Sequence, residues 1–347
     1  MKKVKNFIEA AGWPRITIAL FLLALFIIAP FVQVKISTSI SDTIVRFGRN
    51  GVMALAMVPM IRSGCGLNFG LPLGIIGGIL GILISIELEL VGLAGFLTAV
   101  GLGVAFAAVL GWGYGVLLNM VKGDEMMIAT YVGFSSVAFM CMAWLLLPFK
   151  SKAMVWGFGG TGLRTTISMD QYWTNILSDF MQFRFFGQVF PTGMLLFFAF
   201  MCFLVWLFFR TRTGQAMSAV GQNPEFARAS GVDVDKMRTF SVMLSTVIGA
   251  IGIIVYAQSY GFVQLYLAPL YMAFPAVAAV LLGGASVNSV SIVHVLVGAF
   301  LFQGILTMTP SVINSMLDGI DISEVLRVII SYGLILYALT RRVREVR

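Results

Sequence analysis

The sequence predicts an all-α, polytopic integral membrane protein of about ten transmembrane helices, with at least one interrupted helix. Hydrophobic residues make up 59% of the 347 residues and charged residues only 11%, whereas a soluble domain carries roughly 25% charged residues. The apolar residues also gather in successive runs of about 20, the length that an α-helix needs to cross the hydrocarbon core. We therefore expect a single transmembrane domain over residues 1–347.

Ten apolar runs define the expected spans. They cover residues 14–34, 45–61, 69–87, 91–120, 126–147, 188–209, 240–260, 267–282, 291–308 and 323–340. An even number of spans places both termini on one side, and the lysines and arginines concentrate there, so this side is cytoplasmic by the positive-inside rule. Orientation and anionic lipid headgroups account for the net charge of +8, and no nucleic-acid partner is needed.

A helix interruption is predicted between the second and third spans. Residues 63–72 read Ser-Gly-Cys-Gly-Leu-Asn-Phe-Gly-Leu-Pro, and irregular backbone at membrane depth is tolerated only inside protein or beside a water-filled path. We therefore expect Gly66, Asn68, Phe69 and Gly70 to line a substrate path, where Asn68 offers hydrogen bonds and Phe69 a stacking face. The alternative is that Asn68 only satisfies backbone groups freed by the break.

Glycines recur at four-residue spacing through the third span. Gly70, Gly74 and Gly78 form this series, and Gly77 and Gly81 lie beside it. Small residues one helical turn apart let two helices approach closely in a membrane. The pattern predicts a tight packing seam along this helix.

The longest connection, about 148–187, is external in this topology. Its aromatic residues suit the membrane interface, and connections of this length are usually functional. The cytoplasmic connection of about 211–238 instead carries helix signals. Asn223 suits an N-cap, Pro224 the first helical position, Glu225 the positive helix start and Gly231 a stop. A helix over about 224–230 is too short to be stable alone, so it is either a plug that docks into a partner or part of an ordinary connecting loop.

These residues carry a family resemblance. The runs 221–224 and 229–232, with Ala227 between them, resemble the Gly-x-Asn-x-x-Ala-Ala-x-x-x-Gly-Ile coupling segment of ABC importer permeases in the ribose, simple-sugar, nucleoside and branched-chain amino acid class. Phe226 replaces the first paired Ala, and Val232 replaces Ile. Residues 278–286 resemble the Leu-Gly-Gly-x-Ser turn of the same class, although the usual second glycine pair is missing.

The resemblance implies a permease subunit in the bacterial plasma (inner) membrane. Its partners would be ABC ATPase subunits that bind ATP and Mg, a second identical or homologous permease, and an extracytoplasmic solute-binding protein; this chain would hold no cofactor or metal. The ATPase dock would comprise Gly221, Asn223, Pro224, Glu225, Ala227, Ser230 and Gly231. The stretch 68–70 is nearer to the pattern of nucleoside carriers than to that of sugar carriers and matches neither. The solute expected is a simple sugar or nucleoside, with a branched-chain amino acid as the alternative.

Three other classes of protein fit the sequence less well. The sequence has no Gly-x-x-x-x-Gly-Lys-Ser/Thr phosphate loop and pairs no nucleophile with a base, so we expect no enzyme activity in this chain. An ion-coupled secondary transporter or channel normally places an ionisable group within the bilayer, and the expected span interiors are almost free of charge. A purely structural subunit is disfavoured by the interrupted helix.

Overall fold

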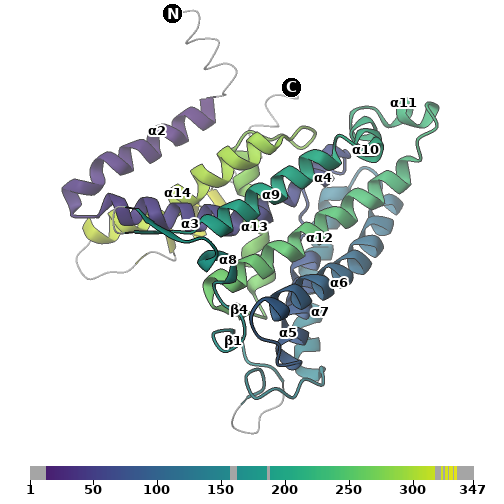
Figure 1. Cartoon of the computed structure of the whole chain (residues 1–347). Helices are drawn as coiled ribbons and strands as arrows, with labels where there is room; N and C mark the ends of the chain where they lie inside the picture. Colours follow the sequence, from purple (N-terminus) through teal and green to yellow (C-terminus); the bar gives the residue numbers. More distant parts are fainter. Residues whose placement is uncertain are drawn as a thin grey trace, which may run out of the picture.

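The computed structural model describes residues 13–156, 162–185 and 188–316, together with 322, 325–326, 328–330 and 332–333 (Figure 1). The longer helices are α2 (Trp13–Ile28), α3 (Ile36–Leu55), α5 (Pro72–Glu87), α6 (Gly92–Met120), α7 (Glu125–Leu146), α9 (Thr192–Phe208), α10 (Arg212–Gln222), α12 (Val234–Tyr260), α13 (Ala268–Leu282) and α14 (Ile292–Met316). Shorter elements are η1 (Ala29–Val32), α4 (Met57–Arg62), α8 (Ile176–Asp179), α11 (Pro224–Ala229), β1 (Thr166–Ser168), β2 (Phe183–Phe185), β3 (Gln188–Phe190) and β4 (Phe262–Gln264).

The structure confirms a mostly helical membrane protein but not the predicted number of spans. Within the described residues, five helical segments are long and apolar enough to cross a membrane: Ile36–Arg62, Gly92–Met120, Glu125–Leu146, Val234–Tyr260 and Ile292–Met316. A sixth is added if α9 and α10, which are bent by 77°, count as one span. Shorter apolar helices lie at Ile16–Val32, Pro72–Glu87 and Ala268–Leu282. The expected span 323–340 lies largely outside the described residues.

Helices α5, α6 and α12 form a closely packed group, and glycines make the close approach possible. An added Cβ on Gly74 would lie 2.3 Å from the carbonyl oxygen of Thr246 on α12. On the neighbouring face of α5, a Cβ on Gly81 would lie 2.4 Å from the carbonyl oxygen of Ala99 on α6. The seam predicted from the four-residue glycine spacing is therefore confirmed, and it holds α5 against two helices at once.

The predicted interruption is also present. Helix α4 ends at Arg62 and α5 begins at Pro72, and the non-helical residues 63–71 between them are almost all buried. Gly64 and Gly66 have φ angles of 77° and 80°, a left-handed conformation that glycine adopts without the steric cost of a Cβ. Pro72 is the first residue of α5, where its missing N–H removes no helical hydrogen bond.

Three expectations need correction. Helix α3 begins at Ile36, not at residue 45, because the polar side chains of its first turns lie against protein, with Ser39 and Thr43 buried. The connection 211–238 contains a second helix, α10, whose Met217 and Val220 are buried. The fold is also not purely helical: β1 pairs with β4, and β2 pairs with β3. The β1–β4 pairing ties the long connection 148–187 to the end of α12.

Two glycines on α6 test the packing. Gly111 faces α12, where an added Cβ would lie 1.8 Å from the Thr246 hydroxyl, whereas nothing lies within 4 Å of a Cβ on Gly113. Gly111→Ala is expected to lower the free energy of unfolding by about 1 to 3 kcal/mol through overpacking. Gly113→Ala should leave stability unchanged or raise it by up to about 1 kcal/mol, because alanine favours the helix. Thermal unfolding of the purified proteins gives the comparison, and equal effects of the two substitutions would contradict this packing.

Candidate functional site

Helix α11 has the capped form that the sequence predicts. The backbone N–H of Phe226 donates to Asn223 Oδ1 at 3.0 Å, and Pro224 stands in the first turn. Gly231 follows the helix with a φ of 83°, in the left-handed region that ends many helices. The helix runs over Pro224–Ala229, within one residue of the expected end. Its existence is confirmed, whereas its docking role stays a prediction.

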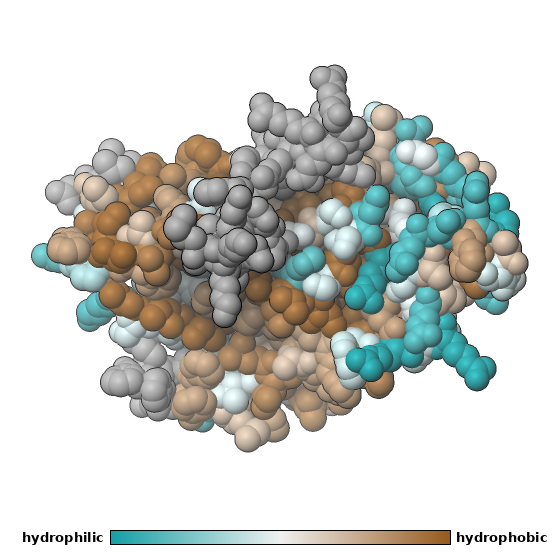
Figure 2. Space-filling model, turned by 90° about the horizontal axis from the view of Figure 1, so that it is seen from above, coloured by the Kyte–Doolittle hydropathy of each residue, from teal (hydrophilic) through white to brown (hydrophobic). Residues whose placement is uncertain are grey.

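Helix α11 is exposed on most of its surface. Ala227 alone among its described residues is buried, against Val220 of α10 and Val234 of α12. Phe226 is 67% exposed. Figure 1 shows α11 at one extreme of the molecule, and Figure 2 shows hydrophilic residues gathered on that side. The exposed residues here are Asn223, Pro224, Glu225, Phe226, Arg228, Ala229, Ser230 and Gly231.

Gly221, like Ala227, is a predicted docking residue that packs against the protein, and it is half-buried. An added Cβ would lie 2.0 Å from the carbonyl oxygen of Arg62 and 2.9 Å from the backbone nitrogen of Gly64. The end of α10 therefore rests directly on the first residues of the interrupted segment 63–71. A displacement of α10 would be transmitted to this segment by contact.

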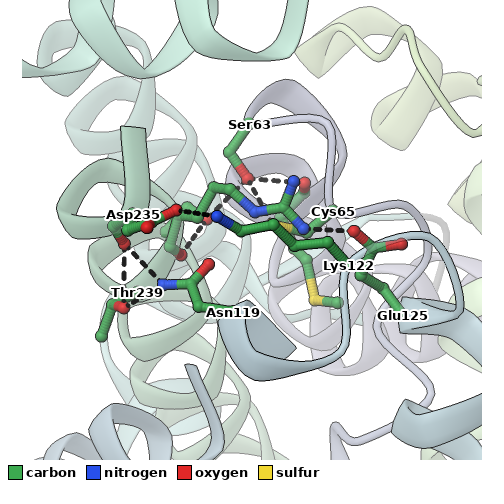
Figure 3. A network of polar contacts seen from close by, with 10 residues as sticks. Ser63, Cys65, Asn119, Lys122, Glu125, Asp235 and Thr239 are labelled. Atoms are coloured by element: carbon green, nitrogen blue, oxygen red, sulfur yellow. Dashed lines mark hydrogen bonds and ion pairs between the residues drawn. The ribbon is translucent and has the colours of Figure 1, made fainter. Parts of the chain in front are cut away.

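Polar contacts join the start of α12 to the connection between α6 and α7 (Figure 3). Arg238 on α12 forms an ion pair with Glu125, and both side chains are largely buried. Lys122 Nζ lies 2.6 Å from Asp235 Oδ1, but this pair is about half exposed. Asn119 Nδ2 donates to the carbonyl oxygen of Asp235 at 2.7 Å. The buried pair is the stronger constraint, since exposed pairs contribute little and an unpaired buried charge is costly.

The interrupted segment 63–71 is bonded to the same face of α12. The hydroxyls of Ser63 and Ser241 lie 2.6 Å apart. One turn further along, Asn68 Nδ2 donates to Ser245 Oγ at 2.7 Å, and Tyr114 donates to Asn68 Oδ1 at 3.4 Å. Asn68 is fully buried. In this conformation its amide joins the segment to side chains of α12 and α6, whereas the alternative considered from the sequence was that it satisfies backbone groups freed by the break.

Residues 66–69 lie near two cavities. Gly66 lines one of about 330 Å³, together with residues 123–127 and 287–288. The ring of Phe69 lies 6.3 Å, centroid to centroid, from that of Phe274, and Phe274 lines a second cavity. Gly70 packs on Tyr114, whose ring would lie 2.4 Å from an added Cβ. The role of Gly66, Asn68, Phe69 and Gly70 in a substrate path stays a prediction.

The second cavity has a polar and aromatic lining that the sequence did not reveal. Its volume is about 140 Å³, and it adjoins a larger cavity of about 570 Å³ that reaches Thr165 and Thr166 beside β1. Its polar and aromatic lining residues come from α3, α12, α13 and α14 and from β4, and include Arg46, Arg49, Asn50, Tyr256, Tyr260, Gln264, Tyr271, Phe274 and Gln303. The available signal was a pair of arginines, Arg46 and Arg49, about one turn apart within the expected span 45–61.

Apolar helices that surround polar cavities make this a multi-pass membrane protein of the kind that moves solutes. Residues 39–339 match the family described as the branched-chain amino acid transport system, permease component. The chain belongs to that family, which comprises permease subunits of ABC importers. Membership implies an ATPase and a binding protein as partners.

Similar proteins were found over part of the chain. The autoinducer 2 import system permease protein LsrC of Yersinia pestis (strain Pestoides F) is 30% identical over 149 residues, which is 41% of this chain and 41% of that protein. LsrC of Yersinia pseudotuberculosis serotype O:1b (strain IP 31758) matches with the same identity and coverage. The match thus spans about two fifths of the length of these relatives. No solved structure matches the chain.

The two roles of Asn68 make different predictions. Asn68→Ala should lower the free energy of unfolding by about 1 to 3 kcal/mol, because the buried Tyr114 hydroxyl and Ser245 lose a partner. Uptake per folded molecule should stay near that of the wild type. Thermal unfolding and uptake kinetics measured together separate the roles, and Ser245→Ala with the double variant tests the coupling. Unchanged stability with altered solute selectivity would place Asn68 in the path instead.

Proposed function

We propose that this chain is the transmembrane subunit of an ATP-driven importer for a small polar solute, most consistent with a simple sugar. The observation that carries the proposal is the position of α12. One end of this helix follows the exposed α11, and the other end lines the polar cavity through Tyr256 and Tyr260. A single helix therefore connects a surface suited to a partner with a cavity suited to a solute.

Coupling would begin at α11. The exposed residues Glu225, Phe226, Ser230 and Gly231 would contact the ATPase, while Ala227 holds α11 on α10 and α12. Closure of the ATPase around ATP would displace α11. The displacement would reach the interrupted segment by two routes: the Gly221 contact with Arg62 and Gly64, and the bonds of α12 to Ser63 and Asn68.

The proposed assembly follows the family. Two permease chains, identical or homologous, would sit on two ATPase subunits that bind ATP and Mg, and a solute-binding protein would deliver solute to the opposite face. The α11 end and both termini would then be cytoplasmic, and the β1 end external. The family match over residues 39–339 supports one permease domain.

The cavity lining supports a hydroxylated solute. Asn50, Gln264 and Gln303 offer both donors and acceptors, and tyrosine rings offer stacking faces. The relatives are permease proteins of autoinducer 2 import systems, which supports the import of a small solute. A nucleoside is the second candidate, because Tyr256 and Tyr260 already stack with centroids 5.3 Å apart and could receive a base. A branched-chain amino acid is the alternative, since the lining also contains Met272, Pro275 and Leu306.

The energy source is tested in proteoliposomes. Uptake by this chain with its ATPase and binding protein should require ATP and persist when ionophores collapse the ion gradients. Withholding the ATPase should abolish it. Accumulation of solute by this chain alone, when only a pH or sodium gradient is imposed, would instead support an ion-coupled transporter.

Substitutions at two glycines with similar backbone conformations test whether α11 docks the ATPase. Gly231 and Gly92 have φ angles of 83° and 60°, and nothing lies within 4 Å of a Cβ on either. Leucine at either position brings a local strain of about 1 to 2 kcal/mol, but only Gly231 adjoins α11. Gly231→Leu should reduce solute-stimulated ATPase activity and uptake while the protein stays folded, and Gly92→Leu should retain both. Normal coupling in Gly231→Leu would show that α11 is not the dock.

A further inference from the structure

Arg49 is a charged residue placed deep in the helical bundle. It is the middle residue of the span Ile36–Arg62 and is only 7% exposed. An arginine at such a position usually faces an interior cavity and has a function there, because a charge is costly within the membrane. Because this span begins at Ile36 and not at residue 45, Arg49 lies at its middle and not near its start.

The surroundings of Arg49 leave its charge only partly compensated. Its guanidinium carbon lies 5.0 Å from the ring centroid of Tyr256 and 4.8 Å from that of Tyr260. Such contacts stabilise a cation but occupy none of its N–H donors. Its Nε has no hydrogen-bond partner among the described residues. Asp42 attracts Arg49 electrostatically, but the ion pairs found in the described part of the chain do not include Arg49.

The cavity beside Arg49 has room and polar groups for a ligand. Arg46, one turn earlier on α3, lines it as well and adds a second positive charge. Asn50 and Gln303 supply neutral hydrogen-bonding groups. The larger cavity beyond, which shares Tyr256, Tyr260 and Gln264 with it, connects this site with the β1 end. A solute arriving from that end would meet two arginines.

We infer that Arg49 binds an oxyanion group of the transported solute, a carboxylate or a phosphate on a sugar-like skeleton. A guanidinium presents its donors in a planar fork that matches either group, and charge-assisted hydrogen bonds are the stronger ones. Among the described residues Arg49 has the attraction of Asp42 and the two tyrosine rings but no ion pair, and an acidic solute would supply a direct counterion where a neutral sugar would not. The inference rests on the proposed import function and specifies the solute class.

Three probes with one skeleton test the inference: D-galactose, D-galacturonate and D-galactose 1-phosphate. Thermal unfolding of the purified chain is followed over a concentration series at constant ionic strength. At least one of the two anions should raise the unfolding temperature, and galactose should do so at least tenfold more weakly. In Arg49→Gln the preference for the anion should be lost, and in Arg49→Lys partly retained, because lysine keeps the charge without the fork.

Arg164→Gln is the matched control, since Arg164 lies in the connection 148–187, outside the cavity lining, with its Nε bonded to the carbonyl oxygen of Val155. It should keep the preference for the anion. Equal shifts with all three probes, no shift with any of them, or an unchanged preference in Arg49→Gln would overturn the inference. The comparison of the three probes uses the wild-type protein, so it does not depend on whether a variant folds. These outcomes are independent of the ATP requirement, so the import function can stand if the anion site fails.

Discussion

A helix that carries polar side chains through a membrane needs partners for them from its neighbours, because lipid offers none. Helix α12 carries several such polar side chains, and the elements packed around it supply their partners. Arg238 forms an ion pair with Glu125, and the hydroxyls of Ser241 and Ser63 share a hydrogen bond. The Ser245 hydroxyl accepts from Asn68 and donates to the carbonyl oxygen of Ala56. Thr246 donates to backbone carbonyl oxygens, including that of Ala107 on α6. The close glycine contacts of α5 and α6 are what bring these partners within bonding distance, so packing and polar pairing depend on each other.

The same pairing explains why the interrupted segment can stay irregular. Residues 63–71 do not continue either flanking helix; most of them are buried, and the backbone N–H groups of Ser63, Gly64, Cys65, Phe69 and Leu71 donate to nearby carbonyl oxygens. Ser63 and Asn68 fix the two ends of the segment to one face of α12. The segment is thus held by side-chain contacts that can break and form again when α12 shifts slightly. The backbone hydrogen bonds of a continuous helix would not allow such a change.

Local features of the sequence were the most predictive. The caps of α11, the break at 63–71 and the glycine seam depend on neighbouring residues and were all predicted. The cavity was not, since Arg49 meets Tyr256 and Tyr260 only in the folded protein, more than 200 residues further along the chain. The start of α3 was misplaced because Ser39, Asp42 and Thr43 lower the hydropathy there. Helix α10 was missed because its three-residue spacing of Gly214, Met217 and Val220 lies within a polar connection.

The length of α12 has a mechanical consequence. Its 27 residues form a rod of about 40 Å at 1.5 Å per residue, fixed near its middle by Asn68 and Tyr114 through Ser245. A rod pivoting there acts as a lever, and a tilt of about 5° would shift each end by roughly 2 Å in opposite directions. That distance is comparable to the difference between a bonded and a broken contact. Widening at the cavity and movement at α11 would then be two ends of one rotation.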